Sequence, residues 1–140
     1  MRIRNSAFNI LVISLISIVV FFSCIKQIQL GGDGVLKGKI SIGPLCPVER
    51  VPPDPACQPT AETYKAWAIA VWTANKKIKV VALNPNLDGT YQVEISAGNY
   101  IVDFDVVHAN PVGGSNLPTV ITITDKDTTI LNINIDTGIR

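Results

Sequence analysis

The chain has 140 residues, of which 47% are hydrophobic and 16% charged, and its formal net charge is +1 at pH 7. That length suits one domain, because single domains usually run to about 100–200 residues. Without the first 23 residues, Lys+Arg falls from 12 to 10 against 11 Asp+Glu, and the formal charge becomes −1. A near-neutral body argues against a nucleic-acid partner, which needs a clustered basic surface, and against an acidic disordered chain.

The first 24 residues have the layout of a secretory signal. Arg2 and Arg4 give a positive start, no charged residue occurs from Phe8 to Phe22, and Ser23-Cys24 follows. An apolar run of about 15 residues is short for a bilayer span, which needs about 20. An ordinary cleavage site requires small residues at positions −3 and −1. Phe21 would hold position −3, so the segment does not suit ordinary cleavage.

The stretch from Phe21 to Cys24 resembles instead the lipobox of bacterial lipoproteins, although that family prefers Leu where Phe21 stands. The resemblance implies that residues 1–23 are a signal peptide and that Cys24 is acylated and becomes the mature N-terminus. Several acyl chains on one residue would anchor the protein stably in a membrane. Because Ile25 rather than Asp follows Cys24, the resemblance also implies the outer membrane of the cell envelope. An uncleaved N-terminal anchor is the alternative.

Beyond Cys24, the sequence predicts a Gly-rich flexible tether up to residue 34 and a folded body from residue 35 to residue 140. Period-two alternation and turn residues predict strands at 35–42, 64–73, 76–83, 90–95, 100–106, 119–124 and 128–135. Seven short strands with frequent turns indicate an all-β, seven-stranded antiparallel sandwich. Segment 61–74 contains helix formers as well as Trp67 and Trp72, so a short helix is the alternative to a strand there.

Cys46 and Cys57 flank a segment rich in proline, which forbids a regular helix or an inner strand. If Cys24 is acylated, these two are the remaining cysteines, and outside the cytoplasm a disulfide is their expected fate. A zinc site would need four ligands, but the only histidine, His108, lies about fifty residues beyond Cys57. The sequence therefore predicts a disulfide between Cys46 and Cys57, and it predicts neither a metal nor another cofactor.

Two stretches of the body carry a family resemblance. Residues 88–91 read Asp-Gly-Thr-Tyr and residues 95–102 read Ile-Ser-Ala-Gly-Asn-Tyr-Ile-Val. Together they resemble the carboxypeptidase regulatory-like domains, which are prealbumin-like (Ig-like) β-sandwiches of bacterial surface and secreted proteins. An Asp-Gly hairpin turn, inward-pointing Tyr91 and Tyr100, and a left-handed Gly98 would account for the pattern. The stretch from Gly38 to Pro47 and the ending Asp-Thr-Gly-Ile-Arg also look like a small bacterial subgroup of such domains. The resemblance implies a structural or binding role without catalytic residues.

Several motifs suggest chemistry that the sequence does not complete. Asp136-Thr137-Gly138 matches the aspartic-protease signature, but that mechanism needs two such carboxylates and only one copy is present. Residues 84–89 space oxygen ligands like the start of a calcium loop, but the twelfth position holds Ile95 instead of the required Glu, so a plain turn is favoured. His108 is interpreted as a loop residue exposed to solvent.

Two groups remain as candidates for contact with a partner. Trp67 and Trp72 could bind a sugar ring, but five residues apart they would point to opposite faces of one continuous strand. The lysines at 76, 77 and 79 are interpreted as a guard against edge-to-edge strand pairing rather than as a phosphate site. The sequence thus predicts a lipid-anchored, extracytoplasmic, non-catalytic sandwich that acts as a surface interaction or structural module. Its partner would be an unknown protein or glycan, and the alternative is a carbohydrate-binding lipoprotein that uses Trp67 or Trp72 with the loop 108–118.

Overall fold

The computed structural model describes residues 32–48, 51, 52, 54–105 and 113–140. Its first strand, β1 (Asp33–Gly43), has alternating apolar side chains and lies inside one of the sheets. Leu36, Ile40 and Ile42 point inward and are at most 6% exposed. Lys37 and Lys39 lie between them on the solvent side. The pattern that predicted this strand is therefore its burial pattern, although the strand begins two residues earlier than predicted. Residues 1–31, including Cys24, lie outside the described residues, and so does His108.

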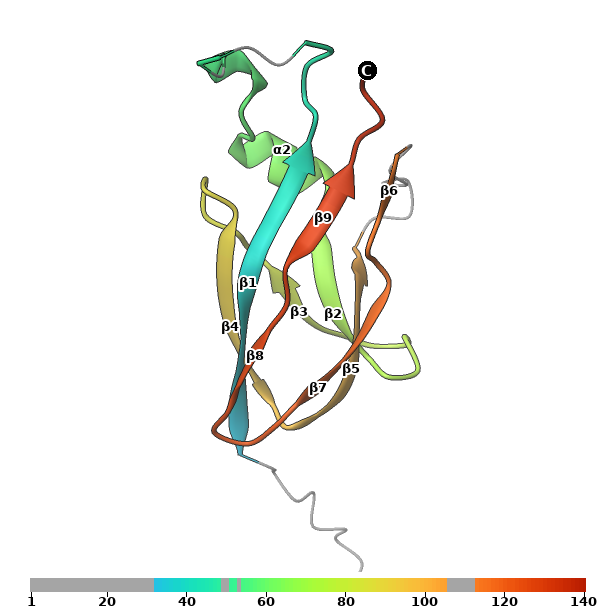
Figure 1. Ribbon diagram of the computed structural model, residues 1–140. Coiled ribbons are helices and arrows are strands. Elements are labelled where there is room, and N and C mark those ends of the chain that lie inside the picture. The colour runs from blue at the N-terminus through green and yellow to red at the C-terminus, as the bar shows by residue number, and fades with distance from the viewer. Residues whose placement is uncertain (1–31, 49–50, 53, 106–112) are drawn as a thin grey trace, which may run out of the picture. The chain divides into compact units, whose positions relative to one another are not determined.

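The described part of the chain contains nine strands, one α-helix and one 3-10 helix (Figure 1). After β1 they are η2 (Pro55–Cys57), α2 (Ala61–Ala66), β2 (Ile69–Thr73), β3 (Lys79–Leu83), β4 (Thr90–Ser96), β5 (Gly98–Phe104), β6 (Gly114–Ser115), β7 (Thr119–Ile123), β8 (Thr128–Ile130) and β9 (Ile133–Asp136).

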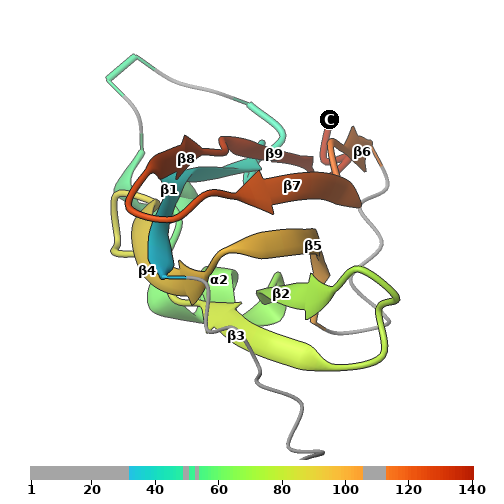
Figure 2. The same ribbon diagram turned by 90° about the horizontal axis from the view of Figure 1, so that it is seen from below.

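The strands form two sheets, which face each other when the protein is viewed from below (Figure 2). One sheet has the order β4-β1-β9-β6, with β8 also paired to β1, and the other has the order β3-β2-β5-β7. The fold is therefore a β-sandwich, as predicted. Its core consists of the inward side chains of both sheets together with Tyr64 of α2. The most deeply buried side chains are Leu36, Ile69, Val71, Val102, Ile123 and Ile133.

The prediction of seven antiparallel strands is wrong in two respects. Two residues in the loop before β7 add the short strand β6, and the predicted strand 128–135 is divided into β8 and β9. Both of these strands run parallel to β1. The chain breaks the ladder at Asn132, whose side-chain oxygen accepts the backbone hydrogen bond of Lys39 at 3.1 Å. Alternation of side chains continues across such a break, so the sequence pattern reads it as one strand.

The strand predicted over 64–73 is also wrong in its first part, because residues 61–66 form the helix α2. Thr60 caps this helix: its hydroxyl accepts from the Thr63 backbone N–H, and the Thr63 side chain accepts from Thr60 N–H. The aromatic and β-branched residues that favoured a strand form one only from Ile69, where β2 begins. A local cap has therefore decided a segment whose residues were ambiguous.

The two glycines assigned to turns behave differently. Gly89 adopts a φ of 84°, which favours glycine, and a side chain there would meet the Ile40 carbonyl oxygen at 2.3 Å. The predicted Asp-Gly turn is thus present. Gly98, in contrast, has no positive φ. It is the first residue of β5, and a Cβ there would approach the hydroxyl oxygen of Tyr100 at 3.3 Å, so its small size rather than a left-handed backbone suits this position.

Candidate functional site

The loop that follows β1 is closed by the predicted disulfide between Cys46 and Cys57, whose Cα atoms are 5.5 Å apart. Within it, the single turn η2 begins at a proline and is capped by Asp54, whose carboxylate accepts from the Ala56 backbone N–H at 2.9 Å. No residue of η2 is buried. Because proline removes backbone donors and apolar burial is lacking here, the crosslink and this cap hold the loop in shape.

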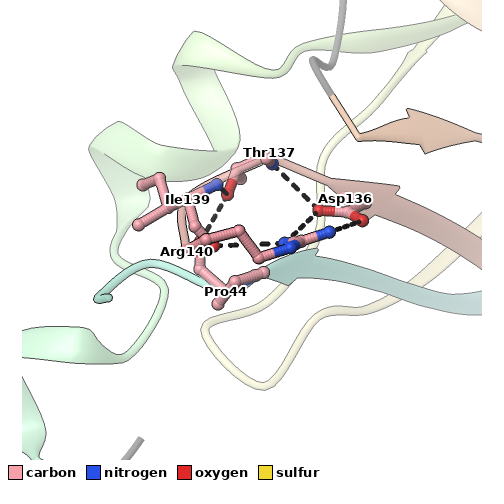
Figure 3. A network of polar contacts seen from close by, with 6 residues as sticks. Pro44, Asp136, Thr137, Ile139 and Arg140 are labelled. Carbon is pink, nitrogen blue, oxygen red and sulfur yellow. Dashed lines mark hydrogen bonds and ion pairs between the residues drawn. The ribbon is translucent and has the colours of Figure 1, made fainter. Parts of the chain in front are cut away.

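A second segment from the other end of the chain is fastened beside this loop (Figure 3). Thr137 donates its backbone N–H to the Gly43 carbonyl at 3.1 Å, and its hydroxyl donates to the Pro44 carbonyl. These bonds continue the pairing of β9 with β1 past the last strand residue. We call the described residues of 44–59 together with the segment 136–140 the loop end of the sandwich.

The Asp136 carboxylate organises the segment 136–140 (Figure 3). Arg140 donates to both of its oxygens, at 3.1 and 2.8 Å, and the Gly138 backbone N–H donates to one of them at 2.9 Å. The hydrogen bond from Arg140, followed by that from Gly138, lowers the pKa of Asp136 below its ordinary value. The Asp-Thr-Gly motif is thus occupied by structural contacts. The Asp136 carboxylate holds Gly138 and Arg140 of the same segment and is not one of a pair of free carboxylates.

The loop end contains a small cleft of about 260 Å³ beside the disulfide. Two apolar side chains of the same loop stay in solvent: Val48 is 68% exposed and Val51 is fully exposed. The residues that line the cleft include Ile42, Pro44, Leu45, both cysteines, Val48, Asp54, Gln58 and Pro59. A crosslinked loop that combines a cleft with exposed apolar groups is suited to contact another surface.

A wider and shallower cleft, of about 500 Å³, lies next to the loop end between α2 and the turn 84–87. Tyr64 lies against this cleft, and its hydroxyl donates weakly to the Leu87 carbonyl at 3.5 Å. Burial, followed by the charge of Asp88, raises the pKa of Tyr64. The Leu87 side chain is 70% exposed at the rim. Two clefts thus lie at or beside the loop end, and a third, of about 360 Å³, lies between Lys37, Gln92 and Ile130 on the sheet that contains β1.

The structure does not bring Trp67 and Trp72 together. Trp67 ends α2 and packs against the core, with its ring centroid 6.2 Å from that of Phe104. Trp72 lies in β2 opposite Ile101 and is partly exposed, and its indole N–H has no hydrogen-bond partner among the described residues. The prediction that they share one strand is wrong, because Trp67 ends α2 and the strand β2 begins only at Ile69. Carbohydrate binding stays a prediction that now depends on a single ring, since Trp67 packs against the core. Residues 108–112 of the loop 108–118 lie outside the described residues.

The remaining candidate motifs have structural roles. In the turn 84–89, Asp88 accepts from the backbone N–H and the hydroxyl of Thr90, at 2.9 and 2.6 Å, and the latter bond is the main reason for its lowered pKa. Lys79 lies on the edge strand β3, as a guard residue should, but it reaches Asp105 at 3.1 Å, while Lys76 pairs with Asp103. Among the described residues, no group of three or more His, Cys, Asp or Glu side chains is arranged to hold a metal ion. In the same residues, we find no helix with the length and hydrophobicity needed to cross a bilayer.

No known family model matches the chain, and no curated protein matches it either. Among solved structures, the minor pilin of the Gram-positive pathogen Streptococcus agalactiae is similar over 76% of this chain and 45% of its own, with 14% identity and a TM-score of 0.50. A DUF3823 family protein from Parabacteroides merdae matches over 76% and 47%, with 15% identity and a TM-score of 0.46. The TIE protein of Bacillus anthracis matches over 75% and 16%, with 14% identity and a TM-score of 0.46.

These likenesses concern the fold alone, because each identity is far below 25%. The chain spans less than half the length of each of these three structures. The comparison with the pilin agrees with the two-sheet arrangement and supplies no functional residue. The loop end was not found from the sequence, because what joins it is long-range: Thr137 meets Pro44 across 93 residues. The sequence did hold one signal for the two segments that meet at the loop end, namely a Gly-Pro-x-Cys-Pro stretch and an Asp-Thr-Gly-Ile-Arg ending in the same chain.

Proposed function

We propose that this protein is a lipid-anchored, non-catalytic β-sandwich of the bacterial cell envelope that works as a surface interaction or structural module, with the loop end as its contact site. The observation that carries the proposal is that the loop end and the start of the body lie at opposite ends of β1. β1 has 11 residues, so the loop end lies about 35 Å from Asp33, where the body begins. A body tethered before Asp33 would hold its crosslinked loop away from the membrane and toward a partner.

The shape of the loop end supports contact rather than catalysis. It offers exposed Val48 and Val51 on a loop held by the disulfide, and the carboxylate of Asp136 is engaged by Arg140. Interfaces rely on apolar groups that are already held in place, because less conformational freedom is then lost on binding. Function is a property of such a site and not of the sandwich itself, which hosts many activities.

We also propose that the body is a carboxypeptidase regulatory-like, prealbumin-like domain. The support is the pair of stretches 88–91 and 95–102, whose parts occupy fitting positions. Gly89 makes the turn, Tyr91 is 4% exposed in the core, and Tyr100 packs against that core. The hydroxyl of Tyr100 donates to the Ser96 carbonyl at 2.8 Å, which fixes the turn between β4 and β5.

The contact site is tested by crosslinking in living cells. A photoreactive amino acid at Val51, on the loop end, is compared with one at Ile130, which is 67% exposed and lies on β8, beside Lys37 of β1. We expect position 51 to give a discrete crosslinked product that position 130 does not give. The same products from both positions, or none from position 51, would contradict the proposed site.

The anchor is tested separately. A radiolabelled fatty acid is supplied to cells that produce the wild-type protein or the Cys24→Ser variant. We expect label in the wild type and none in the variant, together with loss of the variant from the membrane fraction. Equal labelling of the two proteins would remove the lipid anchor and leave the crosslinking result unaffected.

A further inference from the structure

The outward faces of the two sheets differ in chemistry. On the sheet that contains β1, exposed residues such as Lys37, Gln92 and Glu94 are polar, with Ile130 as an apolar exception. On the other sheet, Trp72, Ile101 and Val120 lie opposite one another across β2, β5 and β7 and form an apolar row. Val120 is 74% exposed. The asymmetry leaves one face that can meet an apolar surface without losing much hydration.

The hairpin between β2 and β3 extends this apolar row into solvent. Ile78 is 64% exposed, and Val80 is 42% exposed. The register shifts between Val71 and Trp72, so Trp72 pairs with Lys79 and Val80 has no partner on β2. We call Trp72, Lys77, Ile78, Lys79 and Val80 the hairpin patch.

The charges around the hairpin patch favour an anionic or zwitterionic surface. The two acidic side chains of this face are each neutralised, Asp103 by Lys76 and Asp105 by Lys79. Lys77 forms no ion pair among the described residues. The patch therefore presents aliphatic groups with one uncompensated positive charge, the combination found at the interfacial region of membranes.

The hairpin lies toward the end of the sandwich where the body begins. Asp33 pairs with Ser96, at the turn that leads into β5, and Thr73 pairs with Tyr100, two residues into β5. Thr73 therefore stands closer to the level of Asp33 than to the loop end, and Figure 1 shows the hairpin projecting sideways from the lower half of the sandwich, on the side away from β1. The loop end is at the opposite end of the same strand.

The length of chain before the body limits how far this end can stand from a membrane. This step rests on the proposed anchor at Cys24. Seven residues lie between Cys24 and Gly32, and the eight residue-to-residue steps of a fully extended chain reach about 29 Å. With so short a tether, the body and the membrane surface meet at an effective concentration in the millimolar range. Weak contacts are then enough to keep the body on that surface.

We propose that the hairpin patch rests on the phospholipid surface that holds the anchor, with Ile78 and Val80 at the level of the headgroups and Lys77 among the phosphates. The acidic turn of Asp125 and Asp127, at the same end, stays in water and tilts the body toward the hairpin side. The contact fixes the orientation of the tethered body and points the loop end outward.

The test uses the full lipidated protein in vesicles, with an environment-sensitive fluorophore on a single introduced cysteine. Ile78→Cys is the test position, and two controls match its exposure: Ile130→Cys on the polar sheet and Leu87→Cys next to the loop end, where the native side chains are 67% and 70% exposed. The native Cys46 and Cys57 are joined in the disulfide and do not react. One set of vesicles is phosphatidylcholine, and a second contains phosphatidylethanolamine with phosphatidylglycerol.

We expect the probe at position 78 to shift to shorter wavelength and to be quenched by lipids brominated on their acyl chains, with the larger shift in the anionic vesicles. Probes at 130 and 87 should keep the spectrum of water. Equal spectra at all three positions in protein that has entered the vesicles would overturn the lipid contact while the anchor stands. A shift at position 78 in native membranes but not in pure lipid would overturn it too, because a protein would then be the occupant. Failure of the protein to enter the vesicles at all would instead count against the anchor.

Discussion

Between the two sheets, Leu36, Ile69 and Ile133 are at most 1% exposed, whereas at the loop end no residue of η2 is buried and Val51 is fully exposed. The body is thus stabilised by the removal of apolar surface from water. The loop end is held by a disulfide, by the Thr137 bonds to β1 and its following residue, and by the Asp136–Arg140 pair. Exposed side chains in a region held by local bonds can be substituted without unfolding the core. Binding loops on folded scaffolds commonly have this property.

The largest effect is expected in the body. Leu36→Ala removes a fully buried side chain from the central strand, and it should lower the free energy of unfolding by about 2–5 kcal/mol, because transfer and cavity terms add. Urea denaturation followed by far-ultraviolet circular dichroism measures it. Ile130→Ala is the control and should stay within about 0.5 kcal/mol of the wild type. Equal losses in the two variants would refute the assignment of the core.

Removal of the disulfide tests the difference between the body and the loop end most directly. Replacing Cys46 and Cys57 by serine together should cost about 3 kcal/mol, the chain-entropy value for a loop of this length. The strand signal in circular dichroism should remain, since the loop lies outside the core. Limited proteolysis should then cut within residues 44–59 before it cuts any strand, and cleavage in the strands first would contradict the comparison.

Tyr91 tests the body by pH. Burial raises its pKa to about 12, and its hydroxyl donates to the Leu131 carbonyl at 2.7 Å. A folded-state pKa above the unfolded value of about 10 means that the stabilisation is complete below pH 10 and is lost as the pH rises toward 12. Tyr91→Phe should therefore cost about 1 kcal/mol at neutral pH, and this difference from the wild type should shrink across that range. A difference that stays constant in alkaline urea titrations would disprove the assignment.

The smallest effect is expected at the loop end. Arg140 lowers the pKa of Asp136, so the stabilisation is present above the unfolded value of 3.8 and is lost as the pH falls through the lower folded value. Arg140→Ala should have a slight effect on unfolding at neutral pH, because the pair is exposed to solvent, and no effect once the carboxylate is protonated. An effect that grows in acid would show that the arginine acts through something other than this carboxylate.

The sequence was informative where the alternation of side chains or the chemistry of a turn decides the local structure. Alternation placed Leu36, Ile40 and Ile42 in the core, and Asp88-Gly89 made its turn. It was misleading at 61–66, where the Thr60–Thr63 cap outweighed strand propensity, and at Asn132, where a side chain replaces a backbone acceptor.

Features made by distant partners could not be predicted in the same way. Among them are the bonds from Thr137 to Gly43 and Pro44, and the pairing of β8 and β9 with β1. The predicted pairing of Cys46 with Cys57 succeeded because it depended on cysteine number and compartment rather than on tertiary detail.

The position of β1 has a consequence for how the chain matures. This first strand lies between β4 on one side and β8 and β9 on the other, and Ile40 pairs with Ile133, 93 residues later. Contacts of such high sequence separation form slowly, since a long loop must close before they stabilise anything. A chain that becomes available to fold from its N-terminus first could pair β1 with β4 early, but the other edge of β1 would stay unpaired until residues 128–136 were available. Until then, the backbone donors and acceptors along this edge of β1 would be open to pairing with another chain.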